Sequence, residues 1–298
     1  MNRASVMKRV AVLAFLGGIV VVLAVVWRVP QRLTHGALCI ASNSFDSAGG
    51  SPAWSPDGTT IAFRKGQPHS WLGKGIWLVH ADGTGLRLLT HPSSCYGDDG
   101  PAWSPDGRRL AVDDGHGISL INVRDGGRRK LVSRGNDPTW SADGRWIAFA
   151  KGGVDKTRLY VVRADGTGLR RIDTSDTQVF HPSWSPDGSM IVFAGNRSGL
   201  YVARVSGGRR RQISDDREAD NPAWSPDGKR IAFSEDCCVL LRNASRGGRT
   251  SLVYESDSDE GETDGASWSP DGRRIAFFDG DVYIVNADGT GLHRIADL

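Results

Sequence analysis

One phrase recurs six times along this chain. Five copies contain Trp-Ser-Pro-Asp-Gly, and the third reads Trp-Ser-Ala-Asp-Gly. The successive tryptophans lie 49, 37, 44, 40 and 44 residues apart. The copies occupy residues 52–58, 101–107, 138–144, 182–188, 222–228 and 266–272. A period of roughly 40–45 residues with several short strands per unit is typical of a β-propeller blade, so the sequence predicts six blades.

Each copy of the phrase predicts a bulged β-hairpin. In Ser55-Pro-Asp-Gly58, the proline presets φ, the aspartate accepts hydrogen bonds from the turn, and the glycine supplies the left-handed conformation. Turn chemistry therefore accounts for the six aspartates, and the tryptophans are expected to fill the core between blades. An apolar triplet such as 61–63, a second hairpin and a final strand such as 86–89 complete each unit. The expected fold is all-β, a six-bladed β-propeller of four-stranded antiparallel blades.

This phrase resembles the TolB-type, WD-repeat-like propeller repeat of the PD40 family. The resemblance also includes the Asp-Gly-Thr-Gly-Leu turns at residues 82–86, 165–169 and 288–292, and it covers about residues 45–298. It implies a propeller. The family's namesake also carries an amino-terminal α/β domain that is not expected here, so its partner-binding role is not carried over. The same repeat occurs in the propellers of prolyl-oligopeptidase-like proteases and oligogalacturonate lyases, so the resemblance alone implies no activity.

The amino-terminal end predicts a membrane anchor. Residues 10–27 are 18 consecutive uncharged, mostly apolar residues, and Arg3, Lys8 and Arg9 precede them. As a helix, 18 residues are about long enough to cross a hydrocarbon core of roughly 30 Å. We therefore expect a cytoplasmic stub, one transmembrane helix and a linker in residues 1–36, and an extracytoplasmic propeller in residues 37–298. The alternative is a secretory signal that is cleaved.

The charge of the chain excludes some partners. Five basic residues belong to the anchor region, which leaves 32 basic and 34 acidic residues in 37–298, a net charge of −2. A nucleic-acid-binding domain is typically strongly basic, so we expect no nucleic-acid partner. The few residues before the apolar run also leave no room for an inward-signalling domain in the sequence as printed.

The two faces of the predicted ring differ in charge. Basic residues such as Arg108, Arg109 and 209–211 follow the turns on one face, whereas acidic residues and longer loops belong to the other. A solvated surface that happens to segregate would explain this pattern, and a face that attracts a cationic partner would explain it too. We predict the acidic loop face as the binding surface, with contacts from Trp71, Tyr96, Asp98, Asp99, Asp215 and Asp216.

The sequence contains no recognisable catalytic or metal-binding motif. Gly-x-Ser-x-Gly, His-Glu-x-x-His and Cys-x-x-Cys are all absent. The histidines assigned to the acidic face are scattered along the sequence at positions 69, 91, 116 and 181. We therefore predict no catalytic residue, no metal site and no cofactor. Cys39 and Cys95 are the expected disulfide of an exported protein, while Cys237 and Cys238 either form a vicinal disulfide or remain thiols.

These observations predict a membrane-anchored, non-enzymatic propeller of a bacterial cell envelope, which binds a protein or glycan partner on its acidic loop face. The alternative is a propeller enzyme, a lyase or hydrolase, with a site on the same face of the ring.

Overall fold

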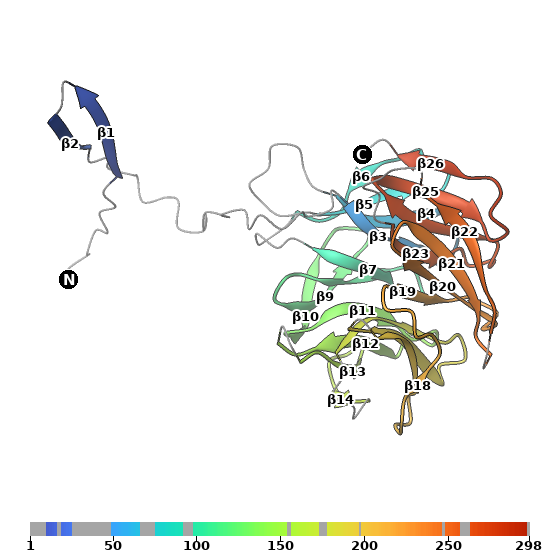
Figure 1. Ribbon diagram of the computed structural model, residues 1–298. Helices are drawn as coiled ribbons and strands as arrows, with labels where there is room; N and C mark the ends of the chain where they lie inside the picture. Colours follow the sequence, from blue (N-terminus) through green and yellow to red (C-terminus); the bar gives the residue numbers. More distant parts are fainter. Residues whose placement is uncertain are drawn as a thin grey trace. The chain divides into compact units, whose positions relative to one another are not determined.

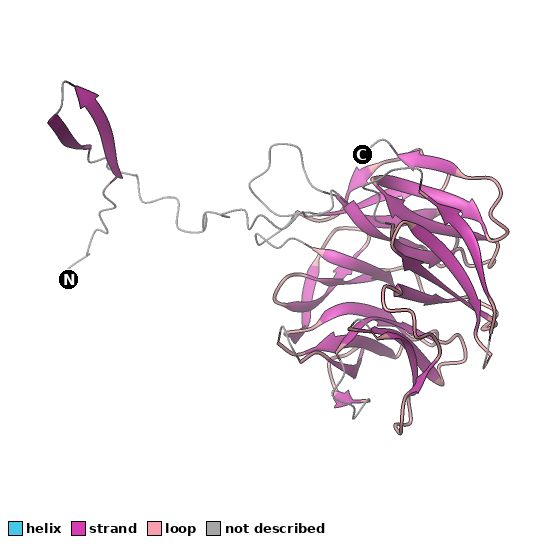
Figure 2. Ribbon diagram, in the orientation of Figure 1, coloured by secondary structure: helices cyan, strands magenta, loops and turns pink. Residues whose placement is uncertain are grey.

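The computed structural model describes residues 10–16, 19–25, 49–65, 75–91, 98–153, 156–172, 178–196, 198–245, 248–256 and 263–296. The chain divides into two compact units, Met1–Ala41 and Ser42–Leu298. Among the described residues of the second unit, the strands form six four-stranded antiparallel sheets arranged as blades of a propeller (Figures 1 and 2). The predicted six-bladed all-β fold is confirmed, and the described residues contain no helix.

In the first three blades, every strand pairs with the next one along the chain. Blade 1 consists of β3 (Gly49–Trp54), β4 (Thr60–Lys65), β5 (Gly75–His80) and β6 (Arg87–Leu88). Blade 2 consists of β7 (Asp99–Trp103), β8 (Arg109–Asp113), β9 (Gly117–Asn122) and β10 (Arg128–Ser133). Blade 3 consists of β11 (Asn136–Trp140), β12 (Trp146–Lys151), β13 (Arg158–Arg163) and β14 (Arg170–Arg171).

The last three blades repeat this order. Blade 4 consists of β15 (Val179–Trp184), β16 (Met190–Gly195), β17 (Gly199–Arg204) and β18 (Arg211–Gln212). Blade 5 consists of β19 (Asp220–Trp224), β20 (Arg230–Glu235), β21 (Cys238–Asn243) and β22 (Thr250–Glu255). Blade 6 consists of β23 (Asp264–Trp268), β24 (Arg274–Asp279), β25 (Asp281–Asn286) and β26 (His293–Ala296).

The repeated phrase forms the turn between the first and second strand of each blade. In blade 1, the Ser55 hydroxyl donates to Asp57 Oδ1 at 2.5 Å and accepts from the Thr60 amide at 2.9 Å. Gly58 has φ +70°, the left-handed conformation that the turn requires. The Ser141-Ala-Asp-Gly copy forms the same contacts without proline. Because the serine hydroxyl hydrogen-bonds the Asp57 carboxylate, the pKa of Asp57 lies below its ordinary value.

The second and third strands supply most of the core of each blade. The apolar triplet after each turn is buried, and its third residue is a fully buried phenylalanine in five blades, at positions 63, 149, 193, 233 and 277. Blade 2 has the smaller Val112 at this position. Burying a phenylalanine side chain contributes about 2–3 kcal/mol, so this layer is a main source of the stability of the ring.

The tryptophans of the phrase join neighbouring blades. Trp103 Nε1 donates to the Ala53 carbonyl at 3.0 Å, and Trp184 and Trp268 make the equivalent bond to the blade before them. The guanidinium of Arg109 lies over the Trp140 ring at 4.9 Å, and two further arginines stack likewise on the tryptophan of the next blade. Part of the predicted basic face is therefore used in packing between blades.

Among the described residues, blades 1 and 6 share no strand, and the ring closes mainly by side-chain packing. Blade 1 is built entirely from residues 49–88 and blade 6 from residues 264–296. Trp54 and Phe63 of blade 1 pack with Phe278 and Ile284 of blade 6 in one buried cluster. The Trp54 amide also donates to Ser267 Oγ at 3.3 Å.

The amino-terminal unit differs from the predicted transmembrane helix. Its described residues form two antiparallel strands, β1 (Val10–Leu16) and β2 (Ile19–Val25), paired from Val10–Val25 to Leu16–Ile19. The run is rich in valine, whose branched Cβ atom favours strands over helices. No helix that is long and apolar enough to cross a bilayer occurs among the described residues. The predicted boundary at residue 36 lies outside them.

Candidate functional site

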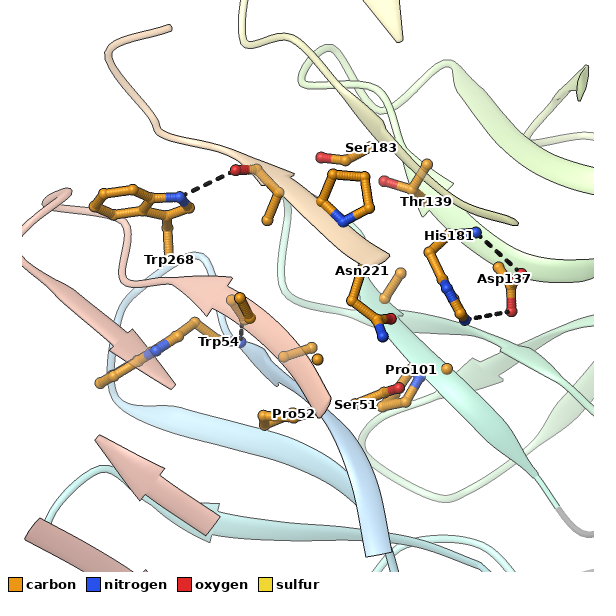
Figure 3. A pocket seen from close by; sticks show the side chains of 18 of the residues that line it. Ser51, Pro52, Trp54, Pro101, Asp137, Thr139, His181, Ser183, Asn221 and Trp268 are labelled. Carbon is orange, nitrogen blue, oxygen red and sulfur yellow. Dashed lines mark hydrogen bonds and ion pairs between the residues drawn. The ribbon is translucent and has the colours of Figure 1, made fainter. Parts of the chain in front are cut away.

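The first strands of the six blades line a central channel. A cavity of about 330 Å³ lies along it, and its walls come from β3, β7, β11, β15, β19 and β23 (Figure 3). Every inner strand contributes the residues around its tryptophan, so the cavity has a six-fold repeated wall.

One backbone position in this wall is unusual in all six blades. It lies directly before the proline or alanine that opens the repeated phrase, and it has a positive φ between 46° and 66° in every copy. At this point each inner strand has one residue more than its partner, which is a β-bulge. The residues at this position are Ser51, Gly100, Asp137, His181, Asn221 and Gly265. The bulge turns them toward the channel, and they form what we call the bulge ring.

The bulge ring has a constant backbone but variable chemistry. Neither the turn nor the core needs an aspartate, a histidine or an asparagine here, because serine and glycine adopt the same conformation in other blades. Side chains that folding does not require are candidates for function. The side chains of the bulge ring therefore differ between the six repeats for reasons other than folding.

His181 is held between two carboxylates of neighbouring blades. Its Nδ1 lies 2.7 Å from Asp220 Oδ1, and its Nε2 lies 3.7 Å from Asp137 Oδ1. Its backbone amide donates to Asp137 Oδ2 at 3.2 Å (Figure 3). Burial alone would lower the pKa of His181, but Asp220 and Asp137 outweigh it and hold this pKa well above the ordinary value. The two carboxylates therefore favour the protonated, cationic form of the imidazole.

Further carboxylates surround the same end of the channel, where the inner strands begin. Arg64 Nη1 of blade 1 lies 3.0 Å from Asp99 Oδ2 of blade 2. Asn221 Nδ2 of blade 5 donates to Asp264 Oδ1 of blade 6 at 2.6 Å. Asp113, at the end of β8, pairs with Asp99 in the sheet. We call Asp99, Asp113, Asp137, Asp220 and Asp264, together with His181 and Arg64, the acidic mouth.

The acidic mouth has more negative than positive groups. Burial raises the pKa of Asp113 to about 7, and the nearby charges of Asp137 and Asp99 add to this shift. Burial likewise raises the pKa of Asp99 and of Asp264, although Arg64 and His181 respectively oppose it. Raised carboxyl pKa values show that the site would be stabilised by additional positive charge. This end of the channel is therefore suited to a cationic group.

The structure separates two adjacent predicted site residues. Asp99 belongs to the acidic mouth, and its side chain is 42 % exposed. Asp98 is only 1 % exposed and accepts two hydrogen bonds from Arg128, at 2.8 and 2.6 Å, and one from Thr90 at 2.6 Å. Asp98 therefore stabilises blade 2 and its connection to blade 1 instead of facing solvent.

The other predicted contact residues lie away from this mouth or outside the described residues. Asp215 is exposed, and Asp216, which is half-buried, hydrogen-bonds Glu235 at the edge of blades 4 and 5. Trp71 and Tyr96 lie outside the described residues, as do Cys39 and Cys95 of the predicted disulfide. Cys237 and Cys238 are free thiols.

Nothing in the sequence indicated that Arg64 and Asp137 belong to the site. Four other members of the acidic mouth were predicted only as part of the acidic face in general: Asp113, His181, Asp220 and Asp264. A comparison of the six repeats would have found Asp137, His181 and Asn221, because these polar residues occupy a variable position directly before a nearly constant phrase.

A family model supports the fold independently. The model of the TolB β-propeller domain matches residues 115–297, which is more than half of the chain. The chain belongs to the TolB β-propeller domain family. The uncharacterized protein Atu1656 of Agrobacterium fabrum is 28% identical over 172 residues, which are 55% of this chain and 54% of that protein. The chain thus spans about half the length of this relative.

Solved structures of different function share the fold. TolB from Acinetobacter baumannii matches with a TM-score of 0.60 and 19% identity, over 90% of this chain and 70% of that chain. A gluconolactonase from Xanthomonas campestris matches with a TM-score of 0.65 and 16% identity, over 80% of this chain and 86% of that chain. At these identities the likeness concerns the fold alone.

Proposed function

We propose that this TolB-family propeller is a non-enzymatic binding module of the bacterial cell envelope, which takes up a cationic group of a protein partner at its acidic mouth. The observation that carries the proposal is the cluster of five carboxylates with His181 and Arg64 beside a 330 Å³ cavity, which Asp137 and His181 line. A lysine, an arginine or an amino terminus would supply the missing positive charge.

The raised carboxyl pKa values give this binding a pH signature. A cation binds the ionised form of Asp113, whose pKa is about 7. Below that pH the carboxyl must first lose its proton, so the affinity should rise as the pH increases from about 6 to about 8. Binding should also release protons at neutral pH, because the bound cation lowers the pKa of Asp113.

A short lysine peptide serves as the probe, with a glutamine peptide of equal length as its control. Calorimetric titration of the full chain should show binding of the lysine peptide that weakens with salt. Replacing Asp137→Asn and Asp264→Asn together keeps acceptors for His181 and Asn221 but removes two charges. This variant should lose about tenfold or more in affinity. The control Asp215→Asn, exposed but outside the mouth, should not.

Two results would reject the proposal. One is equal loss of affinity in the mouth variant and the Asp215→Asn control. The other is binding that shows no dependence on salt or pH. Turnover of a lactone or an oligosaccharide by the full chain, lost in the mouth variant, would favour the propeller-enzyme alternative.

We also propose that residues 10–27 tether the propeller to the extracytoplasmic side of the cell membrane. The support is the sequence: 18 uncharged residues between basic flanks. Spanning as a helix would require these residues to leave the paired arrangement of β1 and β2. Protease added to intact spheroplasts should degrade the propeller, and salt washing should not release the full chain from membranes. Protection from the protease would refute this orientation.

A further inference from the structure

Two thiols and a carboxylate converge on the outer part of blade 5. Cys237 lies in the two-residue turn between β20 and β21, and Cys238 is the first residue of β21. Cys238 pairs with Glu255 across β21 and β22. The Sγ atoms of the two cysteines are 3.6 Å apart, and both lie within 4.8 Å of a Glu255 carboxylate oxygen. The three side chains therefore point their donor atoms at one small volume.

The backbone around this volume is fixed from two sides. The Ser256 amide, directly after β22, donates to the Cys237 carbonyl at 2.9 Å. The buried Thr263 hydroxyl, which precedes blade 6, donates to the Cys238 carbonyl at 2.9 Å and contacts the Asp236 carbonyl at 3.2 Å. These contacts hold the turn in place without using any of the three donor side chains. The donor set is therefore preorganised.

The spacing of the sulfur atoms fits a tetrahedral ion such as zinc. Zinc binds thiolates at about 2.3 Å in tetrahedral geometry, which places two ligand sulfurs about 3.8 Å apart. The observed 3.6 Å is close to that separation. Glutamate is an accepted third zinc ligand, whereas sites for Cu⁺ usually avoid carboxylates.

The surroundings favour a cation and leave it accessible. Glu235 is the pairing partner of Cys238 in the hairpin, and it hydrogen-bonds Asp216 of the preceding connection. Cys237 and Cys238 are half-buried and Glu255 is exposed, so an ion can enter from solvent. We propose that Cys237, Cys238 and Glu255 form a zinc site with one open coordination position. Binding replaces the two thiol protons, which leave to solvent, and involves no oxidation.

This site is separate from the acidic mouth and does not depend on the proposed function. Its three ligands come from β21, β22 and the turn before them, all on blade 5. Motif searching missed it because adjacent cysteines match no spaced cysteine motif, and because the third ligand is brought in by strand register.

Cobalt titration of the reduced full chain tests the site directly. A background of Cys39→Ser and Cys95→Ser leaves Cys237 and Cys238 as the only thiols. Cobalt should give a thiolate charge-transfer band that saturates at one ion per chain, and zinc should displace it. The band should vanish in the Cys237→Ser/Cys238→Ser variant. Glu255→Gln should weaken zinc binding on the order of 10–100-fold, whereas the control Glu218→Gln should stay within about threefold.

The wild-type chain gives a second measurement should the serine background fail to fold. In that case the wild-type chain should bind one more zinc ion per chain than the Cys237→Ser/Cys238→Ser variant. The proposal is overturned if both bind zinc equally, or if Glu255→Gln and Glu218→Gln have the same effect. It is also overturned if Cys237 and Cys238 oxidise to a disulfide in air as fast with equimolar zinc as without it.

Discussion

Closure of the ring between blades 6 and 1 should be the most sterically sensitive point of the bulge ring. A Cβ on Gly265 would lie 2.5 Å from Ser51 Cα and 3.0 Å from Pro52 Cδ, across the closure. Gly100 occupies the same position in blade 2, but its Cβ would meet nothing closer than 3.8 Å. Both glycines have positive φ, +66° and +52°. Comparing Gly265→Ala with Gly100→Ala therefore separates the cost of the steric contact between blades from the cost of the backbone conformation, which both variants share.

The expected magnitudes follow from these contacts. A left-handed conformation costs an alanine about 1–2 kcal/mol, and both variants share this cost. Gly265→Ala must in addition displace backbone atoms of blade 1, which costs about 1–3 kcal/mol more. At about 2–4 °C per kcal/mol, Gly265→Ala should melt clearly below Gly100→Ala.

Urea unfolding of the two variants, followed by tryptophan fluorescence, measures the difference. The chain contains ten tryptophans, and Trp54 and Trp268 lie on either side of the closure, so the signal reports on it. Equal destabilisation of both variants would refute the reasoning, since it would mean that blades 6 and 1 separate at no cost. Greater loss in Gly100→Ala would refute it as well.

Three further predictions concern stability. Asp113→Asn should make the chain more stable than wild type at about pH 8. The reason is that the raised pKa of Asp113 makes folding of the wild-type chain less favourable as pH rises from about 4 to about 7. In thermal melts across that range, the melting temperature of the variant should therefore depend less on pH. Asp98→Asn should destabilise by about 1–3 kcal/mol in urea unfolding, because it removes the buried carboxylate that accepts two hydrogen bonds from Arg128 and leaves that guanidinium only Asp114 at 3.9 Å. Phe193→Ala should cost about 3–5 kcal/mol, whereas Val112→Ala, at the same position of blade 2, should cost clearly less in the same assay.

The fold was predictable because its signals are local and repeated. Ser55, Asp57 and Gly58 determine a turn within four residues, and the apolar triplet after it must then be buried. Six consistent copies leave little freedom in the number of blades. The amino-terminal run lacked such signals, since residues 10–25 are apolar throughout and carry no periodicity that separates a helix from the strands found there.

The site was predictable only in its charge. Sequence placed acidic residues on one face, but it could not tell that Asp99 faces solvent while its neighbour Asp98 is buried against Arg128. Nor could it show that Asp137, His181 and Asp220 meet, because these residues are 44 and 39 positions apart and come from three blades. Proximity across blades depends on the curvature of the ring, which no local pattern encodes.

The absence of a strand shared between blades 1 and 6 has a consequence for engineering. β26 is the outer strand of blade 6, and β3 is the inner strand of blade 1, which follows it around the ring. β10 and β11 have the same relation in blades 2 and 3, and only residues 134–135 join them. A short linker from residue 296 to residue 49 should therefore be accommodated, and new termini opened at residues 134–135 would leave every sheet intact. Such a circular permutant would fold to the same ring with its new termini between blades 2 and 3.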